Sequence, residues 1–533
     1  ELISLNELAQ KNFEITSSVA GSSHPAGQVA LGVVAILLTI LACFNYMNIS
    51  VASSSKRLKE IALRKVMGSD RKGIATQFLV ENFMQVLFAL ILGSLISYFL
   101  FMPGFNTMLP FTVPFRFVSI PMMMLFFLGI LLFVGIISSL YPALYVSKFQ
   151  PVSIFKGKTR FGSRNLFSKI LLGFQLTFAF ITVVASFLFS DNALHLKNQE
   201  WGYDGEDVLS VRVNDASQFV ALREFAKENP HVRDMVGSSG NFTQDFDIMT
   251  VNHLETEVRS VVLGTSPQYP GLMDMKLKEG RAINSLLDDA ANREILINEE
   301  FVTKMDWEEP LGKKITIDSA KYTVVGIVEN FKYHVWFGYE QMLPAIVKVA
   351  PEEQYQYAIF KSTAGNLDAM DEEVKSKWLE IAPNDPYDRV IQANAYDEYL
   401  NEMDSNVIII SFISLIAIIL ASLGLFGLLS FNIQSRLKEF SVRKILGAPV
   451  IEIIRVAAKQ YLWIVLIGFF IGAPIGYFLI DSMIQNIYPD PKPTSWFPFV
   501  LAITIMVSML LVSIIGQLLK AVNVNPAENL RNE

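Results

Sequence analysis

Long apolar runs separated by short polar connections occupy both ends of the chain, and one long polar stretch lies between them. A helix that crosses the hydrocarbon core of a membrane needs about 20 mostly apolar residues. Seven runs meet this requirement, at residues 28–50, 76–101, 120–147, 168–190, 406–431, 458–482 and 497–520. The pattern therefore predicts an α-helical polytopic membrane protein with one large inserted domain.

The inserted stretch, residues 191–405, contains segments with the alternating pattern of strands and segments with the pattern of helices. Residues 208–213 and 322–328 are rich in Val with stretches of alternating polarity, which predicts strands. Residues 217–228 and 367–381 predict helices, each ended by a proline shortly afterwards. We expect an α+β domain that is large enough to bury a core of its own.

Residues at both ends of this domain are expected to continue the neighbouring spanning helices. Residues 195–201 follow the fourth apolar run, and residues 396–403 precede the fifth. Helical stalks of this kind would transmit movement across the membrane.

Composition and charge support a membrane protein and orient it. The chain is 52% hydrophobic and 18% charged, with a mean hydropathy of +0.37. One set of connections holds 21 Lys and Arg residues, at 51–75, 148–169, 434–460 and after 519; the other set, 102–120 and 482–498, holds 2. The positive-inside rule places the basic set in the cytoplasm and residues 191–405 outside.

The inserted domain carries the acidic balance of the chain, with 39 acidic and 20 basic residues. Because this excess lies outside, we expect no nucleic-acid partner.

A basic segment occurs twice, as SKRLKEIALRKVMGS at 55–69 and as SRLKEFSVRKILGA at 435–448. The two copies align at an offset of 379 residues. The matched positions are Arg57 and Arg436, Lys59 and Lys438, Glu60 and Glu439, Arg64 and Arg443, Lys65 and Lys444, and Gly68 and Gly447.

The same offset continues into the next apolar run. There Gly93 aligns with Gly472, and residues 98–100 align with 477–479. After a slip of four residues, Pro151 aligns with Pro526. One register held through three helices predicts two parallel three-helix repeats.

The repeat predicts the domain layout of the chain. Residues 28–160 and 406–533 are the two transmembrane units, 161–190 are a linker with a spanning helix, and 191–405 are the outer domain. Residues 1–27 are expected to be the end of a first outer domain, with further sequence preceding residue 1. The intact protein would then have eight spanning helices and two outer domains.

The basic segment predicts a short amphipathic helix on the inner membrane face. Glu60 precedes Arg64 by four residues, the favourable order for a helical ion pair. Gly68 is suited to end the helix in the left-handed conformation, and Ser69 to cap the next helix. In the repeat, Pro449 suits a first helical turn. The helix could anchor on anionic lipid, or it could dock a cytoplasmic partner with two equivalent subunits.

Residues 44–83, FNYMNISVASSSKRLKEIALRKVMGSDRKGIATQFLVENF, closely resemble the FtsX/MacB-type ABC transporter permeases. The segment SSLYPALYVSKFQPVSIFKGK resembles the end of that family's transmembrane unit. LKEGRAINS, EILINEEFV, PLGKKITI and YTVVGIVENF resemble its periplasmic core domain. The resemblance covers nearly the whole chain and is to the long form that carries both FtsX-like halves.

This resemblance implies a multi-pass protein of the bacterial inner membrane with residues 191–405 in the periplasm. It implies coupling helices at 57–67 and 436–446, each seated in one subunit of a homodimeric cytoplasmic ABC ATPase that holds the ATP and Mg. Membrane lipid and a periplasmic or outer-membrane protein are the other expected partners. The two halves differ at Glu81, which aligns with Gln460, and at Ser69-Asp70, which aligns with Ala448-Pro449.

Catalytic motifs are not evident in the chain. Gly157-Lys158-Thr159 would need a glycine at position 152 to form a phosphate loop, and Val152 is there. The five histidines lack metal-ligand spacing, Gly237–Gly240 lacks the spacing of a nucleophile elbow, and Cys43 is the single cysteine. We expect no catalytic residue, no metal and no cofactor bound by this chain.

The apolar runs carry Glu81 and Asp481 only near their ends, which argues against an ion channel or a proton-coupled pump. Gly93 with Ser97, and Gly472 with Gly476, form small-xxx-small faces that predict close helix packing; a hinge near Pro474 is the alternative.

Together these features predict the permease subunit of an ABC transporter, which couples hydrolysis on a separate ATPase to movement of outer domains. Export, extrusion or lipoprotein handling are the implied tasks. The alternative is a signalling scaffold that regulates a periplasmic partner such as a cell-wall hydrolase.

Overall fold

The protein divides into two compact units, which we describe separately. In the computed structural model the described residues are 25–56, 58–109, 112, 120–147, 166–243, 245–254, 256–283, 293–333, 343–435, 446, 449–488 and 491–522. The inserted unit comprises Asp191–Asp404 and Ser482–Pro493, and the helical unit comprises the rest of the chain. The predicted end of a first outer domain, at residues 1–27, lies almost wholly outside the described residues.

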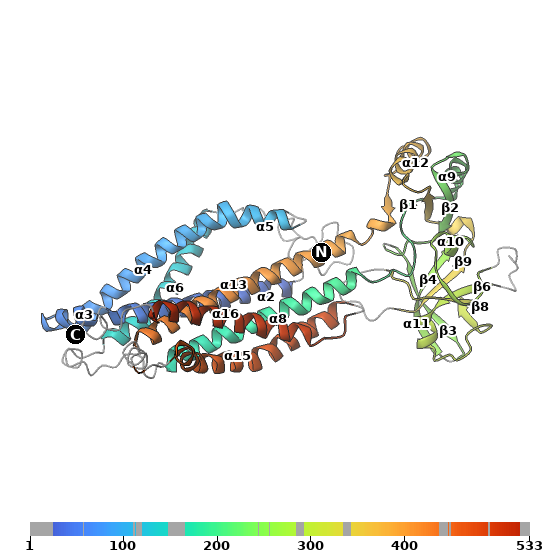
Figure 1. Ribbon diagram of the computed structural model, residues 1–533. Coiled ribbons are helices and arrows are strands. Elements are labelled where there is room, and N and C mark those ends of the chain that lie inside the picture. Colours follow the sequence, from blue (N-terminus) through green and yellow to red (C-terminus); the bar gives the residue numbers. More distant parts are fainter. Residues whose placement is uncertain are drawn as a thin grey trace. The chain divides into compact units, whose positions relative to one another are not determined.

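The helical unit is built from the seven predicted apolar runs, all of which are helices (Figure 1). They are α2 (Pro25–Lys56), α4 (Arg71–Ile96), α6 (Ile120–Ser147), α8 (Leu166–Lys197), α13 (Asp397–Ser435), α15 (Val450–Ile487) and α16 (Phe497–Val522). Within the described part of the chain, six helices are long and apolar enough to cross a membrane. In α6, the stretch Met124–Ser138 is a shorter apolar helix.

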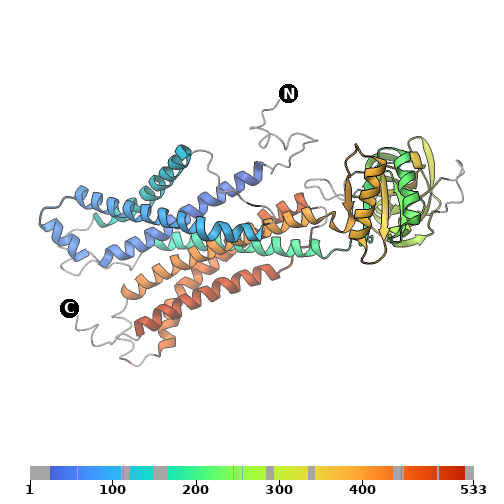
Figure 2. The same ribbon diagram turned by 90° about the horizontal axis from the view of Figure 1, so that it is seen from above.

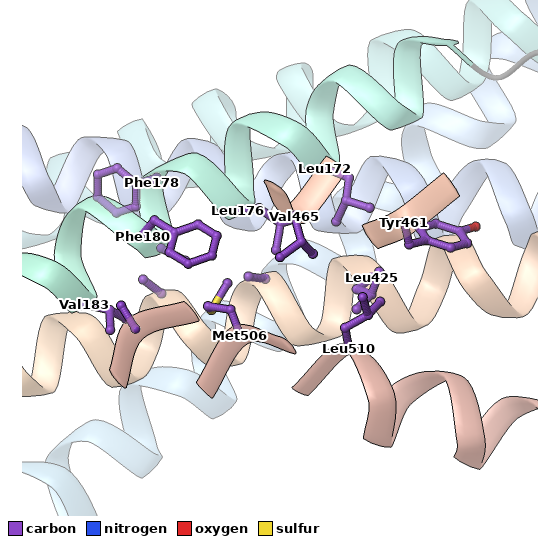
Figure 3. Packing of buried hydrophobic residues seen from close by; sticks show 14 of the residues in the cluster. Leu172, Leu176, Phe178, Phe180, Val183, Leu425, Tyr461, Val465, Met506 and Leu510 are labelled. Carbon is purple, nitrogen blue, oxygen red and sulfur yellow. The ribbon is translucent and has the colours of Figure 1, made fainter. Parts of the chain in front are cut away.

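Five helices of the helical unit, α2, α8, α13, α15 and α16, share a continuous apolar core, part of which is shown in Figure 3. Leu172 and Leu176 of α8 pack with Leu425 of α13, Val465 of α15 and the last helix. From α16, Met506 and Leu510 complete the centre of this cluster, and each is 1% exposed or less.

The first repeat is more open than the second. α4 lies beside α6, where the ring of Phe83 covers Gly135, but its apolar stretch buries no residue fully. A π-helical turn, η2 (Ser97–Phe101), and the short α5 (Met102–Met108) continue α4. Such turns widen a helix locally and often occur at functional sites.

The inserted unit contains eleven strands in one connected sheet among its described residues. They are β1 (Val208–Arg212), β2 (Val232–Ser238), β3 (Asp247–His253), β4 (Thr256–Thr265), β5 (Leu277–Gly280), β6 (Glu294–Asn298), β7 (Lys314–Ile317), β8 (Ala320–Val328), β9 (Ala345–Val349), β10 (Tyr357–Ser362) and β11 (Arg389–Ile391). Six of them close into a ring in the order β4, β3, β7, β8, β6 and β9, because β9 pairs with both β6 and β4. The short α11 (Glu299–Lys304) follows β6 and packs Phe301 into this part of the unit.

The other part of the sheet is a layered α/β structure. Strands β11, β1, β10 and β2 are antiparallel neighbours. The helices α9 (Ala216–Glu228) and α12 (Leu367–Ile381) lie side by side on it (Figures 1 and 2). Leu222 of α9 and Trp378 of α12 are buried in the shared core. The predicted α+β class and all four predicted elements are thus confirmed to within two residues at each boundary.

One prediction at the junctions between units needs correction. α8 ends at Lys197, so residues 198–201 do not extend it, whereas α13 begins at Asp397, within one residue of the predicted start. Gly202 has φ +77, a left-handed conformation that is not helical, and its backbone passes against that of Phe331. The helix must therefore end before this residue. Pro474 does not interrupt α15, which runs as one helix through it.

Candidate functional site

The first basic segment forms a short helix, α3 (Leu58–Val66), that ends where the sequence predicts. Gly68 has φ +99, the left-handed conformation that glycine adopts without a Cβ penalty. The Ser69 amide donates to the Arg64 carbonyl at 3.0 Å, and the Gly68 amide to the Lys65 carbonyl at 3.2 Å. This is the Schellman arrangement, and it turns the chain sharply into α4.

The turn into α4 is capped by Asp70. Its Oδ1 accepts a hydrogen bond from the Gly73 amide at 2.8 Å. The prediction that Ser69 caps this helix is therefore wrong by one residue, because the Ser69 amide already completes the end of α3. In the second repeat, α15 begins at Val450, so Pro449 comes just before the first turn.

Apolar contacts hold α3 against the start of α4. Ile61 is 5% exposed and packs in one cluster with Ile74 and Phe78 of α4, while Ala62 is fully buried. Burial of about two aliphatic side chains contributes roughly 3 kcal/mol relative to exposure. The short helix is thus attached to α4 through its own side chains as well as through the chain.

A chain of hydrogen bonds reinforces this attachment. Arg64 donates to Glu60 Oε1 at 2.7 Å within α3, and to Gln77 Oε1 of α4 at 2.6 Å. Gln77 in turn donates to Glu81 Oε1 at 3.0 Å. Arg64 and Glu60 are each nearly half exposed, so the ion pair alone contributes little stability. Its arrangement instead defines the orientation of α3 on α4.

A second polar group lies one turn deeper, between α2 and α4. The Tyr46 hydroxyl of α2 is 2.5 Å from Asn82 Oδ1 and 2.5 Å from Gln85 Oε1 of α4. The sequence did not single out these residues. Polar residues recur every four positions along α4, at Gln77, Glu81 and Gln85, but this spacing does not show that they meet Tyr46 of α2.

The polar groups of the first repeat have mostly apolar counterparts in the second. At the offset of 379 residues, Gln77 aligns with Val456, Tyr46 with Leu425 and Gln85 with Ile464. Glu81 aligns with the uncharged Gln460. The two repeats therefore do not share this network.

Three apolar side chains at and just after the end of α3 are exposed. Leu63, Val66 and Met67 are 55%, 65% and 79% exposed. Leu446, which aligns with Met67, is 79% exposed. An exposed apolar tip flanked by charges is typical of a surface that another protein or the membrane covers.

Several predicted site residues lie outside the part of the chain that the structure describes. Arg57 lies outside the described residues, as does the side chain of Lys59. The same holds for the second basic segment, namely Arg436, Lys438, Glu439, Arg443, Lys444 and Gly447.

The glycines of α15 lie against α8. A Cβ on Gly476 would be 2.7 Å from the Ile181 carbonyl oxygen. One on Gly472 would be 2.9 Å from Phe180 Cβ and closer still to the Thr177 carbonyl oxygen. In α4, by contrast, nothing lies within 4 Å of a Cβ on Gly93.

At the base of the inserted unit, aromatic side chains join the two chain segments that enter it. Trp201, just after α8, stacks on Tyr396, just before α13, with ring centroids 3.7 Å apart and planes at 9°. The Tyr396 and Tyr203 hydroxyls are 3.0 Å apart, and Gln392 donates to Tyr203 at 3.1 Å. We call Trp201, Tyr203, Gln392 and Tyr396 the aromatic clamp. Burial raises the pKa of both tyrosines, so they stay neutral donors.

Ion pairs tie further segments to this base. Lys197 of α8 donates to Asp404 of α13 at 2.6 Å. Lys492, from the connection between α15 and α16, pairs with Asp191 at 2.7 Å, and its amide donates to Asn192 Oδ1. Lys492 was noted in the sequence only as a rare basic residue on the outer side, so its pairing was not predicted.

One nearly buried ion pair connects the sheet to Asp204, the residue that follows Tyr203 of the aromatic clamp. Lys361 of β10 is 9% exposed and donates to Asp204 Oδ2 at 2.6 Å and to the Glu206 carbonyl at 2.9 Å. Partial burial tends to raise the pKa of Asp204, but the hydrogen bond and charge of Lys361 outweigh it and lower that pKa overall.

Family models match both kinds of segment. A model of the FtsX-like permease C-terminal region matches residues 32–151 and again 411–526. A model of the MacB-like periplasmic core domain matches residues 174–375. The double match reproduces the repeat predicted from the sequence.

Individual relatives agree with these models. The ABC transporter permease YknZ of Bacillus subtilis is 23% identical over 302 residues, which are 54% of this chain and 73% of that protein. The macrolide export ATP-binding/permease protein MacB of Campylobacter jejuni is 31% identical over 125 residues, 22% of this chain and 18% of that protein. The solved periplasmic region of MacB from Actinobacillus actinomycetemcomitans has 11% identity and a TM-score of 0.29, and covers 37% of this chain and 94% of that chain.

These matches account for the helices, the repeat and the inserted unit together. The chain belongs to the FtsX/MacB-type ABC transporter permeases, and it is a multi-pass permease subunit of the inner membrane whose inserted unit is the periplasmic core domain.

Proposed function

We propose that this permease works by mechanotransmission. A cytoplasmic ABC ATPase dimer binds α3 with one subunit and the second basic segment with the other. Closure of the ATPase on ATP shifts both segments, and the spanning helices pass the movement to the periplasmic domain. Permeases of this family work with such an ATPase.

The observation that carries the proposal is the attachment of α3 to α4. Ile61 packs against Ile74 and Phe78, and Arg64 bonds Gln77, so a displacement of α3 must displace α4. The exposed side chains of Leu63, Val66 and Met67 remain available to the partner. A helix that only anchored on lipid would not need polar bonds to the spanning helix.

We infer that ATP and Mg bind to the partner ATPase, and that this chain supplies no catalytic group. The work is done at the outer face of the membrane. We propose extrusion of a substrate from the periplasm or outer leaflet, or handling of a lipoprotein. The similarity to MacB, which is named for macrolide export, supports extrusion more than the scaffold alternative.

The test reverses one charge in each basic segment of the full-length protein. Glu60→Lys with Glu439→Lys places like charges beside Arg64 and Arg443 and should abolish co-purification of the ATPase from membranes. The matched control is Glu452→Lys, an exposed acidic residue in the first turn of α15, which should leave co-purification unchanged. Survival of ATPase binding in the double variant would contradict the docking model.

A further inference from the structure

Amide side chains are buried where α2, α8 and α13 meet in the helical unit. Gln175 of α8 is 1% exposed, and Asn45 and Asn48 of α2 are 6% and 5% exposed. Gln175 directly precedes Leu176, and Leu176 belongs to the apolar cluster in Figure 3. A polar group buried beside such a cluster is costly unless its hydrogen bonds are made, so the partners of these three amides need to be identified.

α2 turns its buried amides toward α8. The Gln175 Nε2 group donates to the Leu41 carbonyl oxygen of α2 at 3.1 Å. Asn45 and Asn48 follow Leu41 at four and seven residues, the spacing of one face of a helix. The two asparagines therefore continue, along α2, the face that contacts Gln175.

α13 closes the same region with glycines. A Cβ on Gly424 would overlap Gln175 Oε1, and one on Gly427 would be 3.2 Å from Ile49 Cγ1 of α2. At the repeat offset these two glycines occupy the positions of the two asparagines of α2. α13 thus comes close to both other helices at residues that bring no side-chain donor or acceptor.

One polar atom of each amide lacks a partner among the described residues. These atoms are Gln175 Oε1, Asn45 Oδ1 and Asn48 Nδ2. The orientation of Gln175 is determined by its surroundings, because only its NH₂ group can face the Leu41 carbonyl oxygen. The region therefore presents at least one acceptor that needs a donor from outside these side chains.

The chemistry of the three atoms indicates the ligand. Water donates and accepts, so it satisfies two acceptors and one donor, and it still fits if the Asn48 amide is turned the other way. A cation would suit the oxygens but not the NH₂ group of Asn48. A lipid acyl chain would supply no hydrogen-bond donor.

We propose that α2, α8 and α13 enclose a buried water site. Water there donates to Gln175 Oε1 and Asn45 Oδ1 and accepts from Asn48 Nδ2. It joins the first helix of each repeat to α8 through bonds that no pair of these side chains makes directly. The proposal rests on the packing of the helical unit and does not depend on the proposed function.

A density map of the full-length protein in lipid nanodiscs, at a resolution that shows ordered water, tests the ligand. A peak is expected within about 2.7–3.2 Å of both Gln175 Oε1 and Asn45 Oδ1. Replacing NaCl with choline chloride at equal concentration should leave the Tm unchanged. A direct bond between the two side chains, an acyl chain in the site, no peak there, or a Tm that falls without Na⁺ would overturn the proposal.

A double-mutant cycle tests whether Asn45 and Gln175 share the water. Asn45→Leu and Gln175→Leu should each lower the Tm by about 2–4 °C, because each leaves the water and the other amide with fewer partners. The double variant should lose less than the sum of the two shifts, since neither amide then remains to be satisfied. Single variants that raise the Tm, or shifts that add, would contradict a shared water.

The matched control for the cycle combines Asn45→Leu with Thr504→Val. Thr504 lies at an exposed position of α16, where its hydroxyl donates to the Val500 carbonyl of its own helix. The Tm shifts of this pair should add, because the two positions share no partner. Equal coupling in the control pair and in the Asn45–Gln175 pair would show that the non-additivity is not due to a shared site.

Discussion

The hydrogen bonds of Arg64 link α3 to α4, so this one residue determines how a movement of α3 would reach the spanning helix. Glu60 and Arg64 recur in the second basic segment, but Gln77, which joins Arg64 to α4, is replaced there by Val456. The basic residues could be recognised in the sequence because they repeat. Gln77, Tyr46 and Asn82 could not, since nothing in one sequence shows which polar residues of neighbouring helices meet.

Replacing Gln77 with valine, the residue of the second repeat, tests this link. The Gln77→Val variant should loosen α3 from α4 by about 0.5–1.5 kcal/mol, the net contribution of a typical hydrogen bond. Backbone amides of α3 should then exchange with deuterium roughly two- to tenfold faster. Thr76→Val, at the exposed neighbouring position, is the matched control; equal exchange in the two variants would contradict the role of Gln77.

The ion pair between Lys361 and Asp204 predicts a pH dependence. Asp204→Asn leaves the nearly buried Lys361 without its carboxylate, which should cost about 1–3 kcal/mol of stability near neutral pH. Because the pKa of Asp204 is lowered by folding, its contribution is full above the unfolded-state pKa of about 4 and is lost as the pH falls through the folded-state pKa. The Tm difference from wild type should therefore shrink on acidification.

The control for this prediction is Glu224→Gln. Glu224 pairs with Lys227 on the exposed surface of α9, and its loss should not change the Tm measurably. A Tm difference between wild type and Asp204→Asn that stays constant down to pH 3 would exclude the assigned ion pair.

At the scale of elements, the sequence predicts helices better than their junctions. Apolar runs located all seven long helices described in the helical unit, because membrane crossing imposes both length and polarity. Strands β1 and β8 were evident from Val-rich alternation, whereas β11 has only three residues and β9 shows no clear alternation. The aromatic clamp was not predicted, because Trp201 and Tyr396 are far apart in sequence and meet only in the folded unit.

Close packing of α8 on α15 makes Gly472 sensitive to the smallest enlargement. Gly472→Ala would overlap the Thr177 carbonyl and should lower stability in detergent by about 1–3 kcal/mol. Gly516→Ala on α16 has open space and should be neutral or stabilising, since alanine favours a helix over glycine by roughly 1 kcal/mol. Thermal unfolding of both variants provides the comparison, and a neutral Gly472→Ala would refute the close contact.

At the scale of the whole molecule, the orientation follows from the charge of the connections and predicts a labelling pattern. In a Cys43→Ser background, Leu254→Cys at the exposed tip between β3 and β4 should react with a membrane-impermeant maleimide in intact cells. Met67→Cys, at the tip of α3, should react only after the cells are permeabilised. Labelling of Met67→Cys, but not of Leu254→Cys, in intact cells would show that the topology is the reverse of the predicted one. The proposed function would then have no basis.

The attachment of the periplasmic domain determines which helix movements it can withstand. α8 leads into β1 and β11 leads into α13, and these strands are antiparallel neighbours, with Leu209 opposite Ile391. Both helices therefore load the same end of one short ladder. If α8 and α13 separated, the hydrogen bonds between β1 and β11 would break one after another, unless the Trp201–Tyr396 stack held that end together. If they moved together, the ladder would carry no opening load, so under the proposed mechanism we expect α8 and α13 to move as a pair.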